Sequence, residues 1–437
     1  MKGMTMERKI TQDLIAWKNN PRRKPLILDG ARQVGKTYTV SAFGSSEYED
    51  FVYFNLEKST KAAEIFDGNI NPERIVGLLS ALVNKQIKPG STLLFLDEIQ
   101  AAGRALTSLK YFQEDAPEYH VVAAGSLLGI AVSRKKISYP VGKVDMMTLY
   151  PMDFEEFCWA LEKRRLSEAI RENYESMQSF SLHDVALDLY RHYLIVGGMP
   201  EAVSAFALNE DYSSINIIQD SIMDSYIADI TKYAEASETV KILEAYNSLP
   251  RQLLKENRKF QYSKIRSGAR ANQYLYPLAW LEAAKITLSC KQITDGFKPI
   301  MAFENPDAFK LYMSDVGLLS AKFEANPYDI IEESLTATLF KGSLAENYIA
   351  QHLVCSGHQP KYWGAPPYAE VDFVITNKNG SVVPIEVKPG TNVRSKSLTI
   401  FREKYDTDYS IRFSAKNFGY ENSIKSLPLY AAFCLES

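Results

Sequence analysis

Four short apolar runs stand out in the first third of the chain. They occupy residues 25–28, 51–56, 92–96 and 119–124, and longer polar or amphipathic stretches separate them. Runs that are apolar on both faces predict central strands of a parallel sheet, and the stretches between them predict helices, such as one expected over 38–43. The region from residue 30 to 132 therefore predicts an α/β fold with helices on both faces of a parallel sheet.

Helical spacing replaces this alternation in the middle of the chain. From residue 153 to 236, apolar positions such as Phe154, Phe157 and Leu161 recur at near-helical intervals, with a sharp break at the glycines of 196–200. Residues 240–249 predict one helix, residues 262–265 are expected to open a second, and residues 271–281 predict a third. Residues 284–288 and 309–313 predict two strands. Three helices followed by a two-stranded wing predict a winged helix-turn-helix.

The last hundred residues return to a mixed pattern. A helix is expected at 344–349, then strands at 370–375 and 382–388, a helix at 396–405 and a strand at 409–413. A chain of 437 residues is long enough for about two to four domains. We expect an α/β core at 1–155, a helical lid at 156–236, a winged-helix region at 237–325 and a C-terminal α/β domain at 326–437.

One octapeptide in the first region carries a specific signal. Residues 30–37 fit the phosphate-binding loop Gly-x-x-x-x-Gly-Lys-Thr at every fixed position, between an expected strand and an expected helix. Backbone N–H groups of such a loop converge on phosphates, and the helix dipole points the same way. Lys36 would reach the β- and γ-phosphates of ATP, and the Thr37 hydroxyl would bind Mg²⁺. The predicted nucleotide-binding residues are Gly30, Ala31, Arg32, Gln33, Val34, Gly35, Lys36, Thr37 and Tyr38.

Two further strand ends supply candidates for hydrolysis. The apolar run at 92–96 ends in Asp97 and Glu98. Asp97 would hold Mg²⁺, and Glu98 would polarise the attacking water. Ser126 follows the strand expected at 119–124, where it would sense the γ-phosphate or cap the next helix.

Composition limits the cellular compartment and the class of partner of this protein more than it limits its activity. Lys and Arg number 50 against 53 Asp and Glu, so the net charge of −3 does not indicate a general polyanion binder. Four scattered cysteines indicate neither a zinc ribbon nor a disulfide framework. The N-terminus lacks an apolar signal core, and no apolar run is long enough to span a bilayer. We expect a cytoplasmic protein without a membrane segment. The sequence leaves open whether the protein forms an oligomer.

Taken together, the motifs resemble a known family. Residues 32–37, 96–100, 124–129, 140–143 and 149–157 are similar, in this order, to prokaryotic AAA-type ATPases that join AAA family 14 to the C-terminal domain DUF4143. The resemblance implies an AAA+ P-loop NTPase core that binds ATP with Mg²⁺. The family often has Arg after Pro-Val-Gly, whereas this chain has Lys143, which keeps the charge but lacks the bidentate fork. Arg134 is an alternative source of that charge.

The expected winged-helix region contains a basic stretch. Residues 251–270 hold seven Lys or Arg residues against one acid, Glu256. Cations on one face of such a fold suit contacts with the phosphates of DNA or RNA. The alternatives are a solvated helix face and a surface that binds protein.

Three acids and a lysine near the C-terminus form an ordered set. Glu346 lies on the helix expected at 344–349, Asp372 on the strand at 370–375, and Glu386 and Lys388 on the strand at 382–388. Residues two apart on a strand share a face, so pairing of the two strands would let Asp372 and Glu386 hold Mg²⁺ or Mn²⁺. Glu346 would complete the metal shell, and Lys388 would act in catalysis on the water or the phosphate.

This set resembles the PD-(D/E)xK restriction-endonuclease superfamily, with Glu-Val-Lys at 386–388 as its second half-motif. The resemblance implies a nuclease-like C-terminal domain, and the alternative is a salt-bridged sheet edge. The combined prediction is an ATP-hydrolysing AAA+ protein that acts on, or is regulated by, nucleic acid. Its alternative is a nucleotide-dependent switch that binds proteins and carries a catalytically degenerate nuclease fold.

Overall fold

The computed structural model of the protein describes residues 6–125, 140, 142–254, 258–332, 334, 338–365, 369–391 and 396–435. The chain divides into two compact units. The first comprises Glu7–Tyr150 with the short segment Ala283–Lys285, and the second comprises Pro151–Glu282 and the chain from Ile286 onward. Within the described residues, no helix is both long and apolar enough to cross a membrane.

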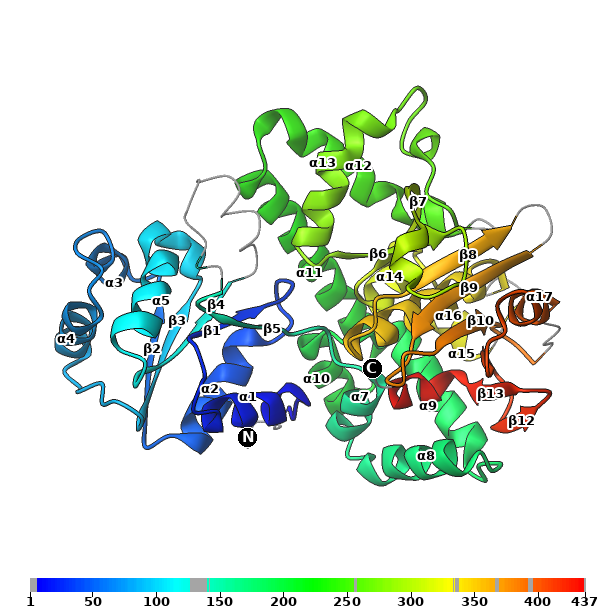
Figure 1. The fold of residues 1–437 in the computed structure, drawn as a ribbon, viewed down its shortest axis with the longest axis horizontal. Coiled ribbons are helices and arrows are strands. Elements are labelled where there is room, and N and C mark those ends of the chain that lie inside the picture. Colours follow the sequence, from blue (N-terminus) through cyan, green and yellow to red (C-terminus); the bar gives the residue numbers. More distant parts are fainter. Residues whose placement is uncertain are drawn as a thin grey trace. The chain divides into compact units, whose positions relative to one another are not determined.

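The first unit is built on a sheet of five described strands, all parallel, in the order β2-β3-β4-β1-β5 (Figure 1). The strands are β1 (Leu26–Asp29), β2 (Asp50–Asn55), β3 (Thr92–Asp97), β4 (His120–Ala124) and β5 (Asp145–Thr148). The four apolar runs therefore form β1 to β4, as predicted. Strand β5 was not predicted, because its four residues are all partly or fully exposed and carry no apolar run.

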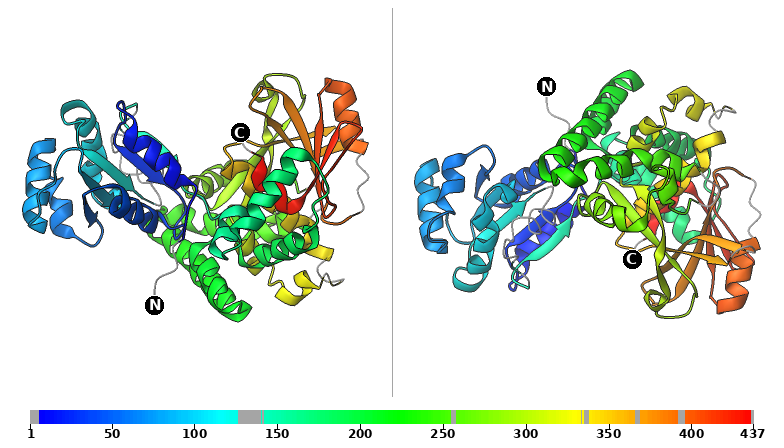
Figure 2. Two further views of the ribbon diagram at one scale, coloured as in Figure 1. Left: turned by 90° about the horizontal axis from the view of Figure 1, so that it is seen from below. Right: turned by 90° about the horizontal axis from the view of Figure 1, so that it is seen from above.

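Helices cover both faces of this sheet, as the pattern of the first third predicts (Figures 1 and 2). They are α1 (Ile10–Asn19), α2 (Lys36–Glu47), α3 (Thr60–Ile65), α4 (Pro72–Val83) and α5 (Gly103–Asp115), with a 3₁₀ turn η1 (Ile99–Ala101). On one face, Leu79 of α4 and Leu109 of α5 share a core with Leu94 and Leu96 of β3. Helix α2, which contacts β2, β3 and β4, carries its own buried residues Val40 and Phe43. Burial on both faces explains why the strands are apolar throughout.

The second unit begins with helices, as the spacing after residue 153 predicts. They are α7 (Phe154–Ala160), α8 (Arg164–Ser176), α9 (His183–Val196), α10 (Pro200–Asn209), α11 (Tyr212–Tyr233), α12 (Ala236–Leu253) and α13 (Ala271–Ala283). The break between α9 and α10 needs glycine for two reasons. Gly197 has a positive φ of 72°. A Cβ on Gly198 would lie 2.0 Å from the carbonyl oxygen of Met152, so no side chain fits there.

Eight described strands form a mixed sheet in the order β12-β13-β11-β10-β9-β8-β6-β7. They are β6 (Thr287–Ile293), β7 (Glu304–Met313), β8 (Lys361–Ala365), β9 (Ala369–Thr376), β10 (Val382–Val387), β11 (Ser410–Ser414), β12 (Gly419–Glu421) and β13 (Ile424–Pro428). The remaining elements are α14 (Val316–Lys322), α15 (Pro327–Ile331), α16 (Thr338–Cys355), α17 (Lys396–Tyr405) and the 3₁₀ turns η2 (Tyr262–Lys264), η3 (Ile300–Phe303) and η4 (Leu429–Cys434). Helix α17 packs on β9 and β10, and α16 packs on β6, β7 and β10 (Figure 1). The C-terminal region is thus a mixed α/β domain, as the alternation of strands and helices predicts.

The winged-helix prediction is wrong in one element and differs in another. The second expected helix, at 262–265, is only the 3₁₀ turn η2, because Ser267 and Gly268 follow and Gly268 takes a positive φ of 76°. The two expected strands overlap β6, which begins only at Thr287, and β7, which begins already at Glu304. Strands β6 and β7 pair antiparallel, but β6 also pairs parallel with β8. The hairpin is therefore part of the large sheet and no separate wing.

Candidate functional site

The loop between β1 and α2 is shaped by its two fixed glycines. Gly30 takes a φ of 152°, and a Cβ there would lie 2.3 Å from the carbonyl oxygen of Leu149. Gly35 takes a left-handed φ of 94° and precedes the first residue of α2. These conformations favour glycine, which is why the pattern fixes both positions. The loop therefore ends at a helix N-terminus whose N–H groups point toward any anion held there.

Lys36, the first residue of α2, is buried. Its Nζ donates to the carbonyl oxygens of Gly30 at 2.8 Å and Ala31 at 2.7 Å. Burial lowers the pKa of Lys36 to about 8, and the carboxylates Glu98, Asp29 and Asp97 only partly oppose this. Among the described residues, the hydrogen-bond acceptors of this ammonium are thus backbone carbonyls and no carboxylate. Such a group favours the approach of an anion.

The predicted Mg²⁺ residues lie together at the end of β3. The hydroxyl of Thr37 donates to Asp97 Oδ2 at 2.8 Å, and the hydroxyl of Tyr53 donates to the same oxygen at 3.2 Å. Asp97 is buried, and its Oδ1 accepts the backbone N–H of Glu98 at 3.0 Å. A hydroxyl and a carboxylate in contact are hard oxygen ligands of the kind Mg²⁺ takes in nucleotide sites. These residues fit the group that the loop implies.

Glu98 lies next to this pair in an unusual backbone conformation. Its φ is 50°, and its Oε2 accepts a hydrogen bond from Gln100 Nε2 at 2.5 Å. Burial raises the pKa of Glu98, and the neighbouring Asp97 raises it further, while the bond from Gln100 opposes both. A carboxylate with a raised pKa beside a phosphate loop suits a base that orients or deprotonates water.

Sequence reasoning missed three side chains that hold this arrangement. Arg8 donates to the carbonyl oxygens of Val34 at 2.9 Å and Tyr150 at 2.6 Å, so it ties the loop to the end of the unit. Tyr53 and Gln100 bond the two acids directly. Tyr53 lies on β2, whose Asn55 is opposite Asp97, but a lone tyrosine in an apolar run gives no sequence signal of this role.

The remaining predictions in this unit have mixed outcomes. Arg32 and Tyr38 are exposed at the loop and the start of α2. Ser126 and Arg134 lie outside the described residues. Lys143 places its Nζ 2.9 Å from Glu114 Oε1, in a solvent-exposed ion pair.

In the second unit, Glu346 projects from α16 into a set of cationic and hydroxyl partners. Its Oε1 accepts the hydroxyl of Tyr312 at 2.5 Å and lies 3.2 Å from Lys310 Nζ, and its Oε2 bonds to Arg258. Burial raises the pKa of Glu346, but Arg258 and Lys310 outweigh burial and hold it below its ordinary value. Both carboxylate oxygens of this residue are therefore occupied.

Asp372 and Glu386 lie on paired strands, which meets the condition under which the sequence brings them together. Strands β9 and β10 are antiparallel, with Phe373 opposite Ile385. Asp372 Oδ2 accepts the backbone N–H of Val387 at 2.8 Å, and Glu386 Oε1 lies 2.6 Å from Lys388 Nζ. Burial raises the pKa of Asp372 to about 7, and repulsion from Glu346 adds to this, while Lys310 opposes it.

These carboxylates fit a divalent cation poorly. Among the described residues, no three His, Cys, Asp or Glu side chains gather as a metal-binding group. A hard cation needs several oxygens at about 2.0–2.6 Å, and here the acids have ammonium and guanidinium partners instead. Glu346, Glu370 and Asp372 all lie near the ammonium of Lys310, and we call these four residues the carboxylate cluster.

One cation of the basic stretch, Arg258, contacts the carboxylate cluster. Arg258 pairs with Glu346, and only 16% of the Arg258 side chain is exposed. Lys255 lies outside the described residues. The other five cations of the stretch are exposed, namely Arg251, Lys259, Lys264, Arg266 and Arg270. Arg266 lies 3.8 Å from Glu244 at the protein surface. The exposed cations keep the stretch suited to phosphate contacts.

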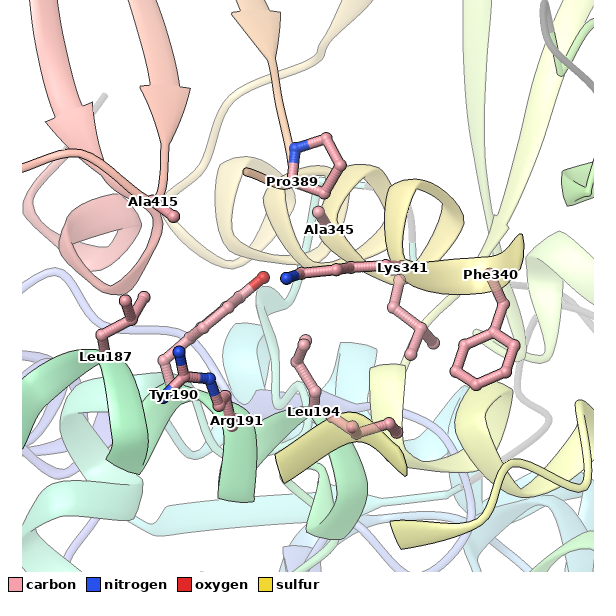
Figure 3. Close-up of a pocket in the computed structure, with 11 residues that line it drawn as sticks. Leu187, Tyr190, Arg191, Leu194, Phe340, Lys341, Ala345, Pro389 and Ala415 are labelled. Atoms are coloured by element: carbon pink, nitrogen blue, oxygen red, sulfur yellow. The ribbon is translucent and has the colours of Figure 1, made fainter. Parts of the chain in front are cut away.

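An apolar pocket lies in the second unit between α9 and α16 (Figure 3). The side chains of Tyr190 and Lys341 point toward one another across it, and Pro389 and Ala345 close one side. Its cavity of about 20 Å³ has room for little more than one water molecule. The pocket is too small for an organic ligand, so we assign it no function.

Comparison with protein families identifies three segments. Residues 22–158 match an AAA domain of family 14, residues 187–329 match the domain of unknown function DUF8612, and residues 341–432 match the domain of unknown function DUF4143. The resemblance to AAA family 14 joined to DUF4143 is therefore confirmed. No curated protein matches this sequence.

Several solved structures are similar at low identity. The Walker-type ATPase PABY2304 of Pyrococcus abyssi has a TM-score of 0.44 at 13% identity, over 73% of this chain and 96% of that one. The ORC2 protein of Aeropyrum pernix, in ADPNP and ADP complexes, has a TM-score of 0.37 at 13% identity, over 76% of this chain and 95% of that one. The RuvB Holliday junction branch migration motor of Thermotoga maritima has a TM-score of 0.31 at 12% identity, over 64% of this chain and 89% of that one.

Proposed function

We propose that this chain, which carries an AAA domain of family 14 followed by DUF8612 and DUF4143, binds ATP with Mg²⁺ and hydrolyses it. The observation that carries the proposal is the buried ammonium of Lys36, which donates to backbone carbonyls within a loop fixed by two glycines. An anionic phosphate would take the place of these carbonyls as the partner of Lys36.

Each nearby residue has a role in the proposed reaction. The loop N–H groups and Lys36 hold the phosphates, while Thr37 and Asp97 hold Mg²⁺ directly or through water. Magnesium, when bound, neutralises charge on the phosphates. Glu98 orients and deprotonates the attacking water, after release of its bond to Gln100. Ser126, which follows β4, remains our candidate for contact with the γ-phosphate.

The change Glu98→Gln tests this proposal with little change in shape. We expect ATP to bind with near wild-type affinity and hydrolysis to fall by about 10²–10⁴-fold, the usual contribution of a general base. Binding is measured with a fluorescent ATP analogue and hydrolysis by phosphate release. The exposed Glu57→Gln serves as the matched control. Unchanged hydrolysis in Glu98→Gln would remove the assigned base.

We further propose that the nucleotide state acts on nucleic acid through residues 251–270, in the cytoplasm. The support is the group of exposed cations at 259–270. The triple change Lys264→Ala, Arg266→Ala, Arg270→Ala is expected to weaken DNA or RNA binding. It should also reduce the slope of the logarithm of the binding constant against the logarithm of the salt concentration, by about one for each phosphate contact that it removes. The matched control removes Lys163, Arg164 and Arg165 at the start of α8, which are also exposed.

A second candidate is a nucleotide-dependent switch that binds protein and does not cut nucleic acid. The observation that favours it is the occupation of Glu346 by Arg258, Lys310 and Tyr312, which withdraws one acid from the expected metal set. It predicts ATP hydrolysis without salt-dependent binding of nucleic acid. Stimulation of hydrolysis by DNA or RNA favours the first candidate instead.

A further inference from the structure

Lys310 is a buried cation in the sheet of the second unit. It lies on β7, none of its side chain is exposed, and its Nζ lies 2.7 Å from Glu370 Oε1 and 3.2 Å from Glu346 Oε1. A third carboxylate oxygen, Asp372 Oδ1, is 4.0 Å away. The ring of Tyr362, with its centroid 5.0 Å from Nζ, lies beside the ammonium. Three acids thus share one internal cation.

A lysine at this depth stays charged because of these acids. Burial lowers the pKa of Lys310, but Glu346, Asp372 and Glu370 outweigh burial and raise it above the ordinary value. The neutral form is therefore not populated at physiological pH. The ammonium supplies the positive charge that the acids would otherwise require from an ion.

Arg258 completes the neutralisation of Glu346 from the other side. The residues next to Arg258 hold its backbone in place. Phe260 N donates to Phe309 O at 2.9 Å, and the backbones of Lys259 and Lys310 form an antiparallel β-bridge. Gly342, one turn before Glu346 on α16, leaves room for the guanidinium, since a Cβ there would lie 2.9 Å from Arg258 Nη2. The cluster and its guanidinium partner are thus assembled from α16, β7, β9 and the segment before η2.

We propose that the ammonium of Lys310 is the resident cation of the carboxylate cluster, in the place where a nuclease-like domain would hold a divalent metal ion. The DUF4143 domain of this chain then binds no divalent ion through Asp372 and does not cut nucleic acid. Glu386 offers one oxygen, Oε2, without a hydrogen-bond partner among the described residues. Its other oxygen pairs with Lys388, so an ion there would face the ammonium of Lys388.

Mn²⁺ itself is the probe for this proposal, added to the nucleotide-free full chain and followed by loss of the free-ion signal in electron paramagnetic resonance. We expect wild type and Asp372→Asn to take up Mn²⁺ equally. We expect Lys310→Met, which keeps most of the length and removes the charge, to take up about one additional Mn²⁺ per chain, and Lys310→Met with Asp372→Asn to lose it again. Lys361→Met is the matched control, because Lys361 is a buried lysine of the same sheet that pairs with Glu304 at 2.6 Å.

The proposal is overturned if wild type binds Mn²⁺, or cleaves DNA or RNA with Mn²⁺, in a manner that Asp372→Asn abolishes. It is also overturned if folded Lys310→Met takes up no more Mn²⁺ than Lys361→Met. If Lys310→Met does not fold, the comparison of wild type with Asp372→Asn decides alone. The outcome is independent of ATP hydrolysis, because the assay omits nucleotide and the cluster belongs to the second unit.

Discussion

The phosphate loop of the first unit and the carboxylate cluster of the second each contain one buried lysine. The partners of the two ammonium groups differ in charge: neutral carbonyls in the loop and carboxylates in the cluster. Lys36 donates to two backbone carbonyls, and burial lowers its pKa to about 8. Lys310 lies between carboxylates, which raise its pKa despite burial. A buried cation without a carboxylate partner calls for an anion, whereas a paired one is already neutralised.

The difference shows why burial of a charged residue does not by itself mark a functional site. At Lys36, the protein leaves a charge to be compensated by a ligand, which is the property of a binding site. At Lys310, the protein supplies the compensation itself, which is the property of an internal ion network. The cost of separating such a network is large, because one charge stays buried without its partner.

Among the changes that test this comparison of the two lysines, the largest effect is expected from removal of the uncompensated one. Lys36→Ala should lower ATP hydrolysis by about 10²–10³-fold or more, since the transition-state charge loses a preorganised donor. Phosphate release at saturating ATP measures it. Lys85→Ala is the control, because Lys85 is an exposed lysine of the same unit that pairs with Asp50. Equal loss in both variants would show that the effect is general instability of the unit.

Removal of the acid that neutralises two cations should be next in size. Glu346→Ala leaves Arg258 and Lys310 without their shared partner, and we expect a loss of about 3–5 kcal/mol in the free energy of unfolding. Urea denaturation followed by tryptophan fluorescence measures it. Glu168→Ala, which breaks an exposed pair with Arg165, should cost less than about 1 kcal/mol. Similar costs for the two variants would contradict the network.

The pH dependence of nucleotide affinity tests the lowered pKa of Lys36. Bound phosphate favours the ammonium form, so the affinity is fully present below about pH 8 and falls as the pH rises through that value. Because one proton is linked to binding, the fall approaches about tenfold per pH unit above pH 8. Titration of a non-hydrolysable ATP analogue at several pH values measures it. An affinity that stays flat to about pH 9.5 would place the pKa of Lys36 near its ordinary value.

The smallest effect is expected at Lys143, the position where the family often has Arg. Its Nζ pairs with Glu114, and both side chains are partly exposed, so Lys143→Ala should change ATP hydrolysis by less than about twofold. The same phosphate-release assay measures it, with Lys85→Ala as the reference. A loss comparable to that of Lys36→Ala would assign Lys143 to the phosphates.

The sequence predicted the placement of the loop and of Asp97 closely because both depend on local features. Residues 30–37 form a contiguous loop, and Asp97 ends an apolar strand whose position in a parallel sheet brings it to the same edge. Strands β9 and β10 were also predicted, since the run at 370–375 alternates clearly and a short turn separates the two strands, whereas β8, β12 and β13 were not predicted. The second helix of the expected winged helix failed, because a serine and a left-handed glycine end it after one turn.

Sequence alone therefore determined the loop at 30–37, the strand that ends at Asp97, the parallel core and the resemblance of the AAA and DUF4143 segments. Only the tertiary structure decided the partners of Glu346. Lys310 is 36 residues away and Arg258 is 88 residues away, on elements whose sequence carries no sign of the contact. A site made of one loop is encoded by its own residues, whereas a network across a sheet depends on which strands become neighbours.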